Sequence, residues 1–240
     1  LYFYTIPGQQ DTGVYEARSI LAFDENNIWI TSGSQITKWD GVRQTFRHST
    51  PVYVNKLWGT DNNNIYAVGY NGQIARNNGT SWQRIESGTN ANIVDISGIL
   101  NEDGKYTKYC AADNLLLYID GDNNLRSIAV EQGMFLNSVW AASNRLIYTA
   151  GNGIVLYKNE SWQKINTPDI NTIYRVKGQS YNDIVGLSST LTVFHFNGYS
   201  WNSIQTGTNN IYLKIQIKNN SIATSGWNGD KALITLLFRN

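Results

Sequence analysis

The sequence has few of the residues that build reactive centres. Its 240 residues include one cysteine, Cys110, and two histidines, His48 and His195. A single cysteine excludes a disulfide framework within the chain and any metal site built from several cysteines. Cys110 lies in the strand-like stretch KYCAAD, and neither histidine stands in a catalytic motif. We therefore expect Cys110 to be a buried, unreactive thiol.

Charged residues and long apolar runs are also scarce. Charged residues make up 15% of the chain and the formal net charge is +1. Such a balance provides no basic field for nucleic acid. No run of about 18 apolar residues occurs, so a membrane-spanning helix is not predicted. No loop groups three oxygen ligands at a calcium-like spacing, and we expect neither a metal nor a cofactor.

Proline is rare, with 3 residues, whereas glycine (21) and tryptophan (8) are plentiful. Turns must therefore be made by Gly and by Asn, which often occurs in runs such as Asn62-Asn63-Asn64. Between the turns lie runs of four to six β-branched or aromatic residues, typical of successive β-hairpins. No long stretch holds the apolar spacing of a helix. The composition therefore favours an all-β protein.

An internal repeat organises these short runs. An apolar anchor recurs at Ile28 and Ile65, 37 residues apart, and at Ile147, Ile184 and Ile222, 37 and 38 residues apart. The longer interval from Ile65 to Ile147 holds one further copy, with an insertion at the turn sequence NEDG. The chain thus contains six copies of one unit.

Each copy reads as four short strands, and six such units predict a six-bladed β-propeller with four antiparallel strands per blade. A solenoid is the alternative, but its repeats usually carry one or two strands. We expect one domain, 1–240, with blades over 17–48, 53–88, 93–130, 135–167, 172–207 and 211–240, the last completed by 1–8.

The two ends of the chain support this arrangement. The last copy stops before its fourth strand, and LYFYTIPG at the N-terminus matches the spacing of SWQRIESG in the second copy. We predict that Tyr2 to Ile6 pairs with Lys231 to Arg239, which would leave no open sheet edge in the last blade. An unrelated N-terminal arm is the alternative.

The turn segments NNGTSW, KNESW and FNGYSW resemble degenerate Asp-boxes, the repeated turns of bacterial neuraminidases. Together with YAVGYNGQI they are similar to repeats of photosystem assembly-factor-type propellers and of uncharacterised bacterial surface propellers. The resemblance implies a propeller whose turns are structural. It carries over no sialidase chemistry, because no arginine stands in a comparable setting. We expect Trp82, Trp162 and Trp201, in these turns, to be core residues.

Binding in a propeller is expected on one face, called here the loop face. This face is formed by the loops between the second and third strands of each blade and by the connections to the next blade. The candidate binding residues are Tyr70, Asn71, Asp113, Asn152, Trp227, Asn228 and, in an inter-blade connection, Arg47 and His48. Alternatively, the Asn and Gly residues are turn formers, and Arg47-His48 is a solvated pair.

This uncharged, amide-rich face favours a noncatalytic interaction scaffold that binds a protein partner. The composition suggests an extracellular or cell-surface setting, with the periplasm as an alternative. A lectin-like, glycan-binding propeller is the first alternative function. The second is an enzyme whose catalytic residues gather in the central channel, although no catalytic residue can be named from the sequence.

Overall fold

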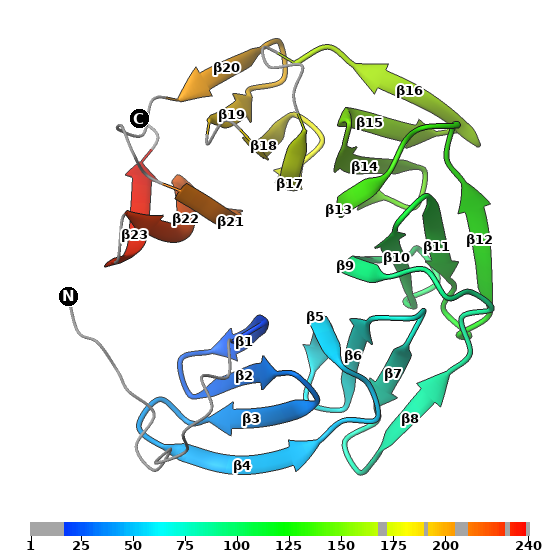
Figure 1. Ribbon diagram of the computed structural model, residues 1–240, viewed down its shortest axis with the longest axis vertical. Coiled ribbons are helices and arrows are strands. Elements are labelled where there is room, and N and C mark those ends of the chain that lie inside the picture. Colours follow the sequence, from blue (N-terminus) through cyan, green and yellow to red (C-terminus); the bar gives the residue numbers. More distant parts are fainter. Residues whose placement is uncertain (1–16, 168–171, 190–191, 205–210, 229–230, 239–240) are drawn as a thin grey trace. The chain divides into compact units, whose positions relative to one another are not determined.

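The computed structural model describes residues 17–167, 172–189, 192–204, 211–228 and 231–238. The regular elements in these ranges are β-strands, which form five four-stranded sheets and one three-stranded sheet, all with antiparallel neighbours in chain order (Figure 1). The predicted all-β, six-bladed propeller is confirmed. None of the described segments is a helix long and apolar enough to cross a membrane.

The sheets are called blades 1 to 6 in chain order, and they fall into two compact units that divide between Val94 and Asp95. The first unit holds blades 1 and 2. Their strands are β1 (Ser19–Asp24), β2 (Asn27–Ser32), β3 (Gln35–Trp39), β4 (Gln44–Ser49), β5 (Val54–Asp61), β6 (Asn64–Gly69), β7 (Ile74–Asn77) and β8 (Trp82–Ile85).

The second unit holds blades 3 to 6, apart from the first two residues of β9. Blade 3 contains β9 (Ile93–Leu100), β10 (Tyr106–Ala112), β11 (Leu115–Ile119) and β12 (Leu125–Ala129). Blade 4 contains β13 (Leu136–Ser143), β14 (Leu146–Gly151), β15 (Gly153–Lys158) and β16 (Ser161–Ile165). Blades 5 and 6 contain β17 (Ile173–Ser180), β18 (Asp183–Ser188), β19 (Val193–Phe196), β20 (Trp201–Ile204), β21 (Ile211–Lys218), β22 (Ser221–Asn228) and β23 (Lys231–Phe238). The predicted N-terminal strand of blade 6 lies outside the described residues, so it stays a prediction.

Side-chain oxygens close the turns between the third and fourth strands. Asn78 Oδ1 accepts the backbone N–H groups of Thr80 and Ser81, both at 3.0 Å. Asn197 and Asp40 accept the corresponding pairs of N–H groups in blades 5 and 1. Because Asn and Asp satisfy the turn backbone in this way, they are the residues that such a turn favours.

Polar side chains also join the first strands of neighbouring blades. The first strand is a sheet edge, so its outward N–H groups need acceptors from elsewhere. The acceptors are hydroxyls or a carboxylate of the preceding blade: Ser19 for the Leu57 N–H (2.9 Å), Asp95 for Val139 (3.1 Å) and Ser138 for Val176 (3.3 Å). Within each unit these bonds set the spacing of adjacent blades.

Two predictions about buried residues can be checked directly. Trp201 packs against the apolar core of blades 4 and 5, as predicted, with its ring 5.3 Å from that of Phe196. Cys110 is a fully buried free thiol, and burial raises the pKa of that thiol. It is therefore a neutral, inert side chain at physiological pH, as expected.

Candidate functional site

The loop face of the first unit presents a pair of tyrosine rings. Tyr70 follows β6 and is 37% exposed, while Tyr53 precedes β5 and is 45% exposed. Their ring centroids are 5.4 Å apart. Tyr53 also lies over Gly33, which has a φ of +59° and where an added Cβ would sit 3.2 Å from the ring. The pair is therefore held in place while it remains open to solvent. Sequence reasoning found Tyr70 and missed Tyr53.

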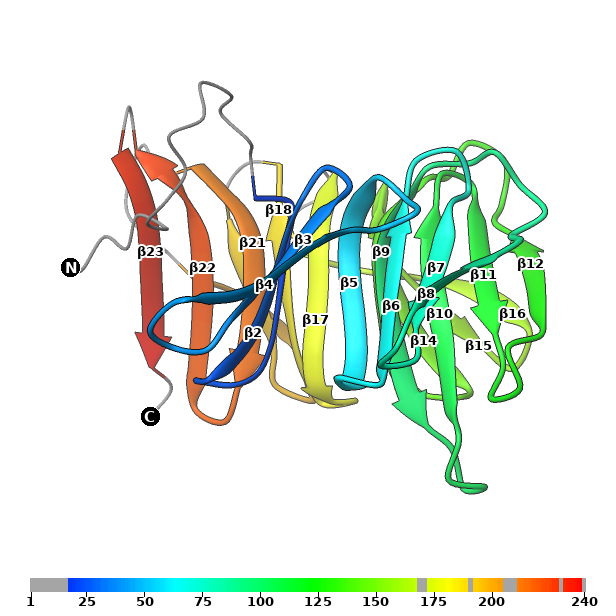
Figure 2. The same cartoon turned by 90° about the horizontal axis from the view of Figure 1, so that it is seen from below.

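Several apolar side chains are exposed at the loop end of the second unit. Trp227 is 40% exposed, and Tyr174, Leu213 and Phe135 are exposed to a similar degree. The start of β17 and the end of β22 lie at one end of this unit (Figure 2). Tyr174 and Leu213 are the extra residues at breaks in strand register near the starts of β17 and β21. A bulge of this kind re-aims its side chain, and the repeat alignment gave no signal for it.

The polar residues predicted on this face form turns or make hydrogen bonds with the backbone. Asn71 has a φ of 53° in the turn where the Gln73 N–H donates to the Tyr70 carbonyl. Asp113 has a φ of 45°, and its carbonyl accepts the Leu136 N–H at 2.6 Å. Asn152 Nδ2 donates to the Gly133 carbonyl at 3.4 Å. These contacts are those of turn formers, the alternative that the sequence left open.

Four predicted site residues lie in strands and not in loops, which corrects the sequence interpretation. Arg47 and His48 belong to β4, the outer strand of blade 1, and Trp227 and Asn228 belong to β22. The strands simply extend further than the turn residues suggested. The Asn228 side chain lies outside the part of the chain that the structure describes. Arg47 lines a hollow of about 770 Å³ with Gln35 and Tyr53.

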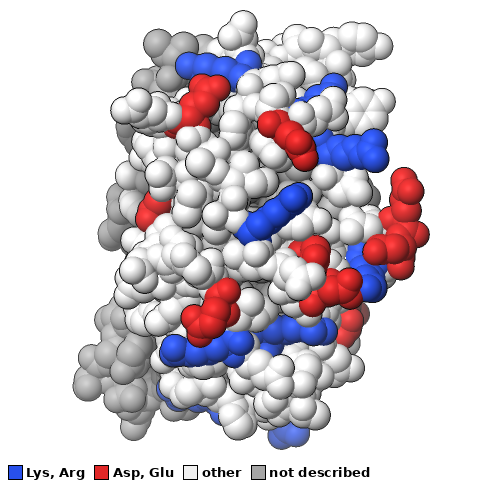
Figure 3. Space-filling model, turned by 90° about the vertical axis from the view of Figure 1, so that its right-hand side faces the viewer, with Lys and Arg blue, Asp and Glu red and all other residues white. Residues whose placement is uncertain are grey.

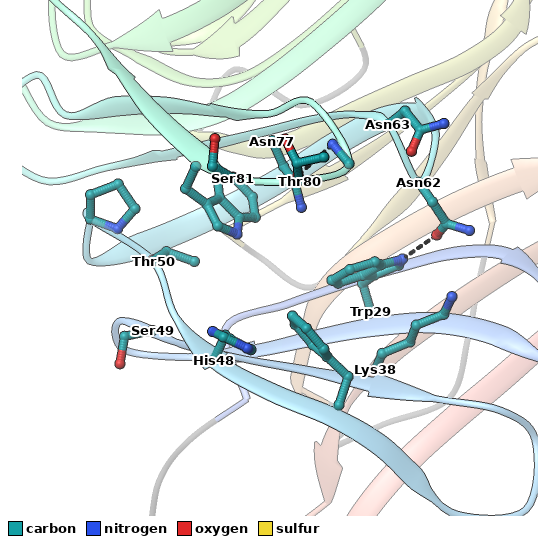
Figure 4. Close-up of a pocket in the computed structure, with 14 residues that line it drawn as sticks. Trp29, Lys38, His48, Ser49, Thr50, Asn62, Asn63, Asn77, Thr80 and Ser81 are labelled. Atoms are coloured by element: carbon teal, nitrogen blue, oxygen red, sulfur yellow. Dashed lines mark hydrogen bonds between the residues drawn. The ribbon is translucent and has the colours of Figure 1, made fainter.

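His48 also lines a groove of about 690 Å³ between blades 1 and 2. In Figure 4, Trp29, Lys38 and His48 come from blade 1, and Asn77, Thr80 and Ser81 face them from blade 2. The full lining is Trp29, Lys38, Phe46, His48, Ser49, Thr50, Pro51, Asn62, Asn63, Asn77, Gly79, Thr80, Ser81 and Trp82. The groove thus combines aromatic rings with amides and hydroxyls, and none of its lining residues is a carboxylate. Sequence reasoning did not predict it.

The aromatic residues of the groove form one continuous wall. The rings of Trp29 and Phe46 meet edge to face at 5.7 Å, and His48 stacks on Phe46 at 4.4 Å. Trp29 Nε1 donates to Asn62 Oδ1 at 2.8 Å, drawn as a dashed line in Figure 4. Trp82 Nε1, by contrast, is buried and has no hydrogen-bond partner.

The corresponding junction between blades 3 and 4 is narrower. Its hollow has a volume of about 260 Å³ and is lined by Tyr109, Tyr118, Arg126, Ile128, Asn144, Arg145, Tyr157, Asn159 and Glu160. Trp162 corresponds to Trp82 in the fourth strand, with Trp82 opposite Asn77 and Trp162 opposite Tyr157. Its Nε1 donates to the Ala129 carbonyl at 3.0 Å. Beside the connection between the two blades, Trp162 also borders a separate cavity of about 10 Å³ with Met134 and Phe135.

A buried ion pair connects blades 3, 4 and 5. Lys177 Nζ lies 2.8 Å from Asp95 Oδ2, and the two side chains are only 12% and 3% exposed. The same oxygen accepts the Ser138 hydroxyl at 2.6 Å and the Val139 N–H at 3.1 Å. Because one oxygen accepts three hydrogen bonds within the fold, this carboxylate is suited to joining blades and not to proton transfer.

A second polar cluster connects blades 5 and 6. His195 Nε2 lies 2.8 Å from Asp183 Oδ1, and Gln179 donates to the other oxygen of the same carboxylate. Gln179 also bonds the Asn219 backbone, both its N–H and its carbonyl. These contacts join the β17–β18 hairpin of blade 5 to the turn between β21 and β22 of blade 6. Within the described ranges, no group of three or more His, Cys, Asp or Glu residues could hold a metal ion.

Surface charge is mixed on the side drawn in Figure 3. Blue Lys and Arg side chains alternate there with red Asp and Glu side chains, separated by uncharged surface. This agrees with the formal net charge of +1.

Comparison with known proteins identifies the fold. No family model matches the chain, and no curated protein does. Among solved structures, YCF48 bound to a D1 peptide is 14% identical, with a TM-score of 0.69 over 94% of this chain and 78% of that one. A streptogramin B lyase is 11% identical, with a TM-score of 0.73 over 93% and 83%. The outer coat vertex of COPII on membranes contains a chain that is 10% identical, with a TM-score of 0.75 over 93% and 70%. The chain therefore has the fold of the β-propellers.

Proposed function

We propose that the chain is a noncatalytic β-propeller that binds a protein partner through its loop face. The observation that carries this proposal is the set of solvent-exposed aromatic rings at the loop end of both units. Tyr and Trp side chains dominate the binding energy of protein interfaces because they bury large areas at a low entropic cost. The Tyr53–Tyr70 pair is such an anchor, already ordered before a partner arrives.

The structural neighbours support this proposal. YCF48 is seen with a D1 peptide, and a further neighbour, BBS1N, is seen in complex with ARL6DN. Both are β-propeller likenesses at low identity, so they show that the fold accommodates such partners. We propose an extracellular or cell-surface assembly as the setting of this interaction, as the composition suggests.

Catalysis is the less favoured function. The lyase likeness rests on 11% identity, which carries the fold and no activity. The single thiol is fully buried, and the most buried carboxylate, Asp95, is engaged by Ser138, Val139 and Lys177. Reactive groups of an enzyme need access to substrate, and these two groups face the interior of the fold.

The proposal is tested by selecting peptides from a displayed library on the intact domain and measuring their affinity for variants. Tyr70→Ala and Trp227→Ala are made separately, so that each unit is assessed by itself. A selected peptide should lose at least tenfold in affinity with one of the two, the loss typical of an interface anchor.

Tyr199→Ala is the matched control. Among the residues that the structure describes, Tyr199 is the most exposed aromatic side chain, but it lies in the turn between β19 and β20, at the opposite end of its blade. Peptide affinity should not change with this variant. If Tyr199→Ala weakens the peptide and both loop-face variants do not, the proposed face is wrong. If the library yields no binding peptide, protein binding by this domain is contradicted.

A further inference from the structure

The groove between blades 1 and 2 has the chemistry of a ligand site that the proposed function does not use. Its volume of about 690 Å³ lies in the range of small-molecule pockets. Tyr70 and Trp227, the residues assigned to protein binding, are not among its lining residues. The groove is therefore a site distinct from the Tyr70 and Trp227 side chains of the loop face.

The lining restricts the class of ligand. A cationic ligand would find no carboxylate, because none of the lining residues is Asp or Glu, and the Lys38 ammonium beside the Trp29 ring would repel it. Phosphate or sulfate groups would call for several cations, whereas Lys38 is the one lysine or arginine in the lining, with its Nζ 5.6 Å from the Trp29 ring centre. A purely apolar ligand would leave the amides and hydroxyls without partners. The remaining class is a neutral ligand with many hydroxyl groups.

We infer that this groove binds a neutral oligosaccharide. Asn side chains and Ser or Thr hydroxyls both donate and accept hydrogen bonds, which is what a sugar hydroxyl requires. Asn62, Asn63 and Asn77 supply the amides, and Thr80 and Ser81 supply hydroxyls on the wall opposite the rings (Figure 4). The apolar faces of sugar rings match the aromatic wall of Trp29, Phe46 and His48.

Trp82 supplies a second, independent observation. Its indole N–H is buried without an acceptor, although buried donors in folded proteins are nearly always paired. Trp162, at the same position of blade 4, donates to the Ala129 carbonyl. Because Trp82 lines the groove, we assign an oxygen of the bound sugar as the acceptor of this N–H.

The test uses the intact domain and a panel of soluble neutral oligosaccharides built from glucose, mannose, galactose or N-acetylglucosamine. Binding is screened on an array and then measured by titration calorimetry. Trp82→Phe keeps a six-membered aromatic ring and removes the five-membered ring with its N–H, and we expect it to weaken the bound oligosaccharide at least fivefold, the effect of one hydrogen bond. His48→Ala, at an exposed end of the wall, should weaken it by a similar factor.

Trp162→Phe is the matched control, because its N–H is satisfied inside the fold. This variant should bind the oligosaccharide as the wild type does. The inference is overturned if no oligosaccharide of the panel binds at millimolar concentration, or if Trp82→Phe and Trp162→Phe bind equally well. It is equally overturned if a library peptide, and no sugar, loses affinity with Trp82→Phe.

Discussion

Two blade junctions, that of blades 1 and 2 and that of blades 3 and 4, share the same pattern of hydrogen bonds. They differ in the residues that line them and in the size of the space they enclose. In each, an aromatic side chain of the second strand donates to the first turn of the next blade. Trp29 does so to the Asn62 side chain at 2.8 Å, and Tyr109 to the Asn144 carbonyl at 2.9 Å. In each, an oxygen on the first strand accepts an N–H of the next blade. The repeat thus determines which positions face a neighbouring blade.

The difference lies in what fills these shared positions. In the first unit the inner oxygen is the Ser19 hydroxyl, and the outer part of the junction is a groove of about 690 Å³. In the second unit it is the Asp95 carboxylate, paired with Lys177, and the outer part is a smaller hollow of about 260 Å³ whose lining includes Arg126, Arg145 and Glu160. The comparison shows how one frame can carry a larger groove without carboxylates at one junction and a smaller hollow lined by charged side chains at another.

The largest difference is expected at the inner oxygens. Asp95→Ala leaves the Lys177 ammonium and the Val139 N–H without their acceptor in a buried place, and should lower the free energy of unfolding by about 3–5 kcal/mol. Ser19→Ala leaves only the Leu57 N–H and should cost about 1–2 kcal/mol. Urea unfolding measures both, and equal costs would remove the distinction between the junctions.

Cys110 reports on the opening of the second unit. Its thiol is fully buried in β10, and burial raises its pKa, so it should not react with a thiol reagent in the native protein at pH 8. Asp95→Ala should make it react at a measurable rate, because loss of the buried pair favours opening of the unit. Ser19→Ala, in the other unit, is the control and should leave the thiol protected. Fast reaction in the wild type would contradict the tight packing described for this unit.

A smaller difference is expected at the aromatic donors. Tyr109→Phe leaves the Asn144 carbonyl without its donor and should cost about 1 kcal/mol of unfolding free energy. Asn62→Ala should cost less, because the groove around Trp29, of about 690 Å³, gives water more room to replace the lost amide than the hollow of about 260 Å³ beside Tyr109. Thermal unfolding of the two variants measures this difference. A larger loss for Asn62→Ala would show that the groove excludes water.

The sequence predicted the fold more completely than the site, for a physical reason. Anchors 37 or 38 residues apart and Gly or Asn turns specify local strand pairing, which each blade repeats. The groove depends on residues from two blades, such as Trp29 and Trp82, which meet only after folding. The bulge at Tyr174 recurs at Asn55, Asn137 and Leu213 in other blades, but these residues differ in type, so the sequence pattern did not predict it.

The sequence did contain one usable signal for the groove. Trp82, Trp162 and Trp201 share a position in the repeat, so an unequal environment at that position had to arise from the neighbouring blade. The prediction that these residues pack in the core holds for Trp201 and for Trp82, which packs against the buried core of blades 1 and 2. It did not predict that Trp82 also lines the groove.

The most direct test of this account is the unfolding free energy of Trp82→Phe compared with that of Trp162→Phe. Both substitutions remove the same atoms, so the pair compares one chemical change in two surroundings. We expect Trp162→Phe to cost about 1 kcal/mol more, since only Trp162 gives up a hydrogen bond. Equal costs, or a larger cost for Trp82→Phe, would show that the Trp82 N–H is satisfied within the fold and that the two junctions do not differ as described.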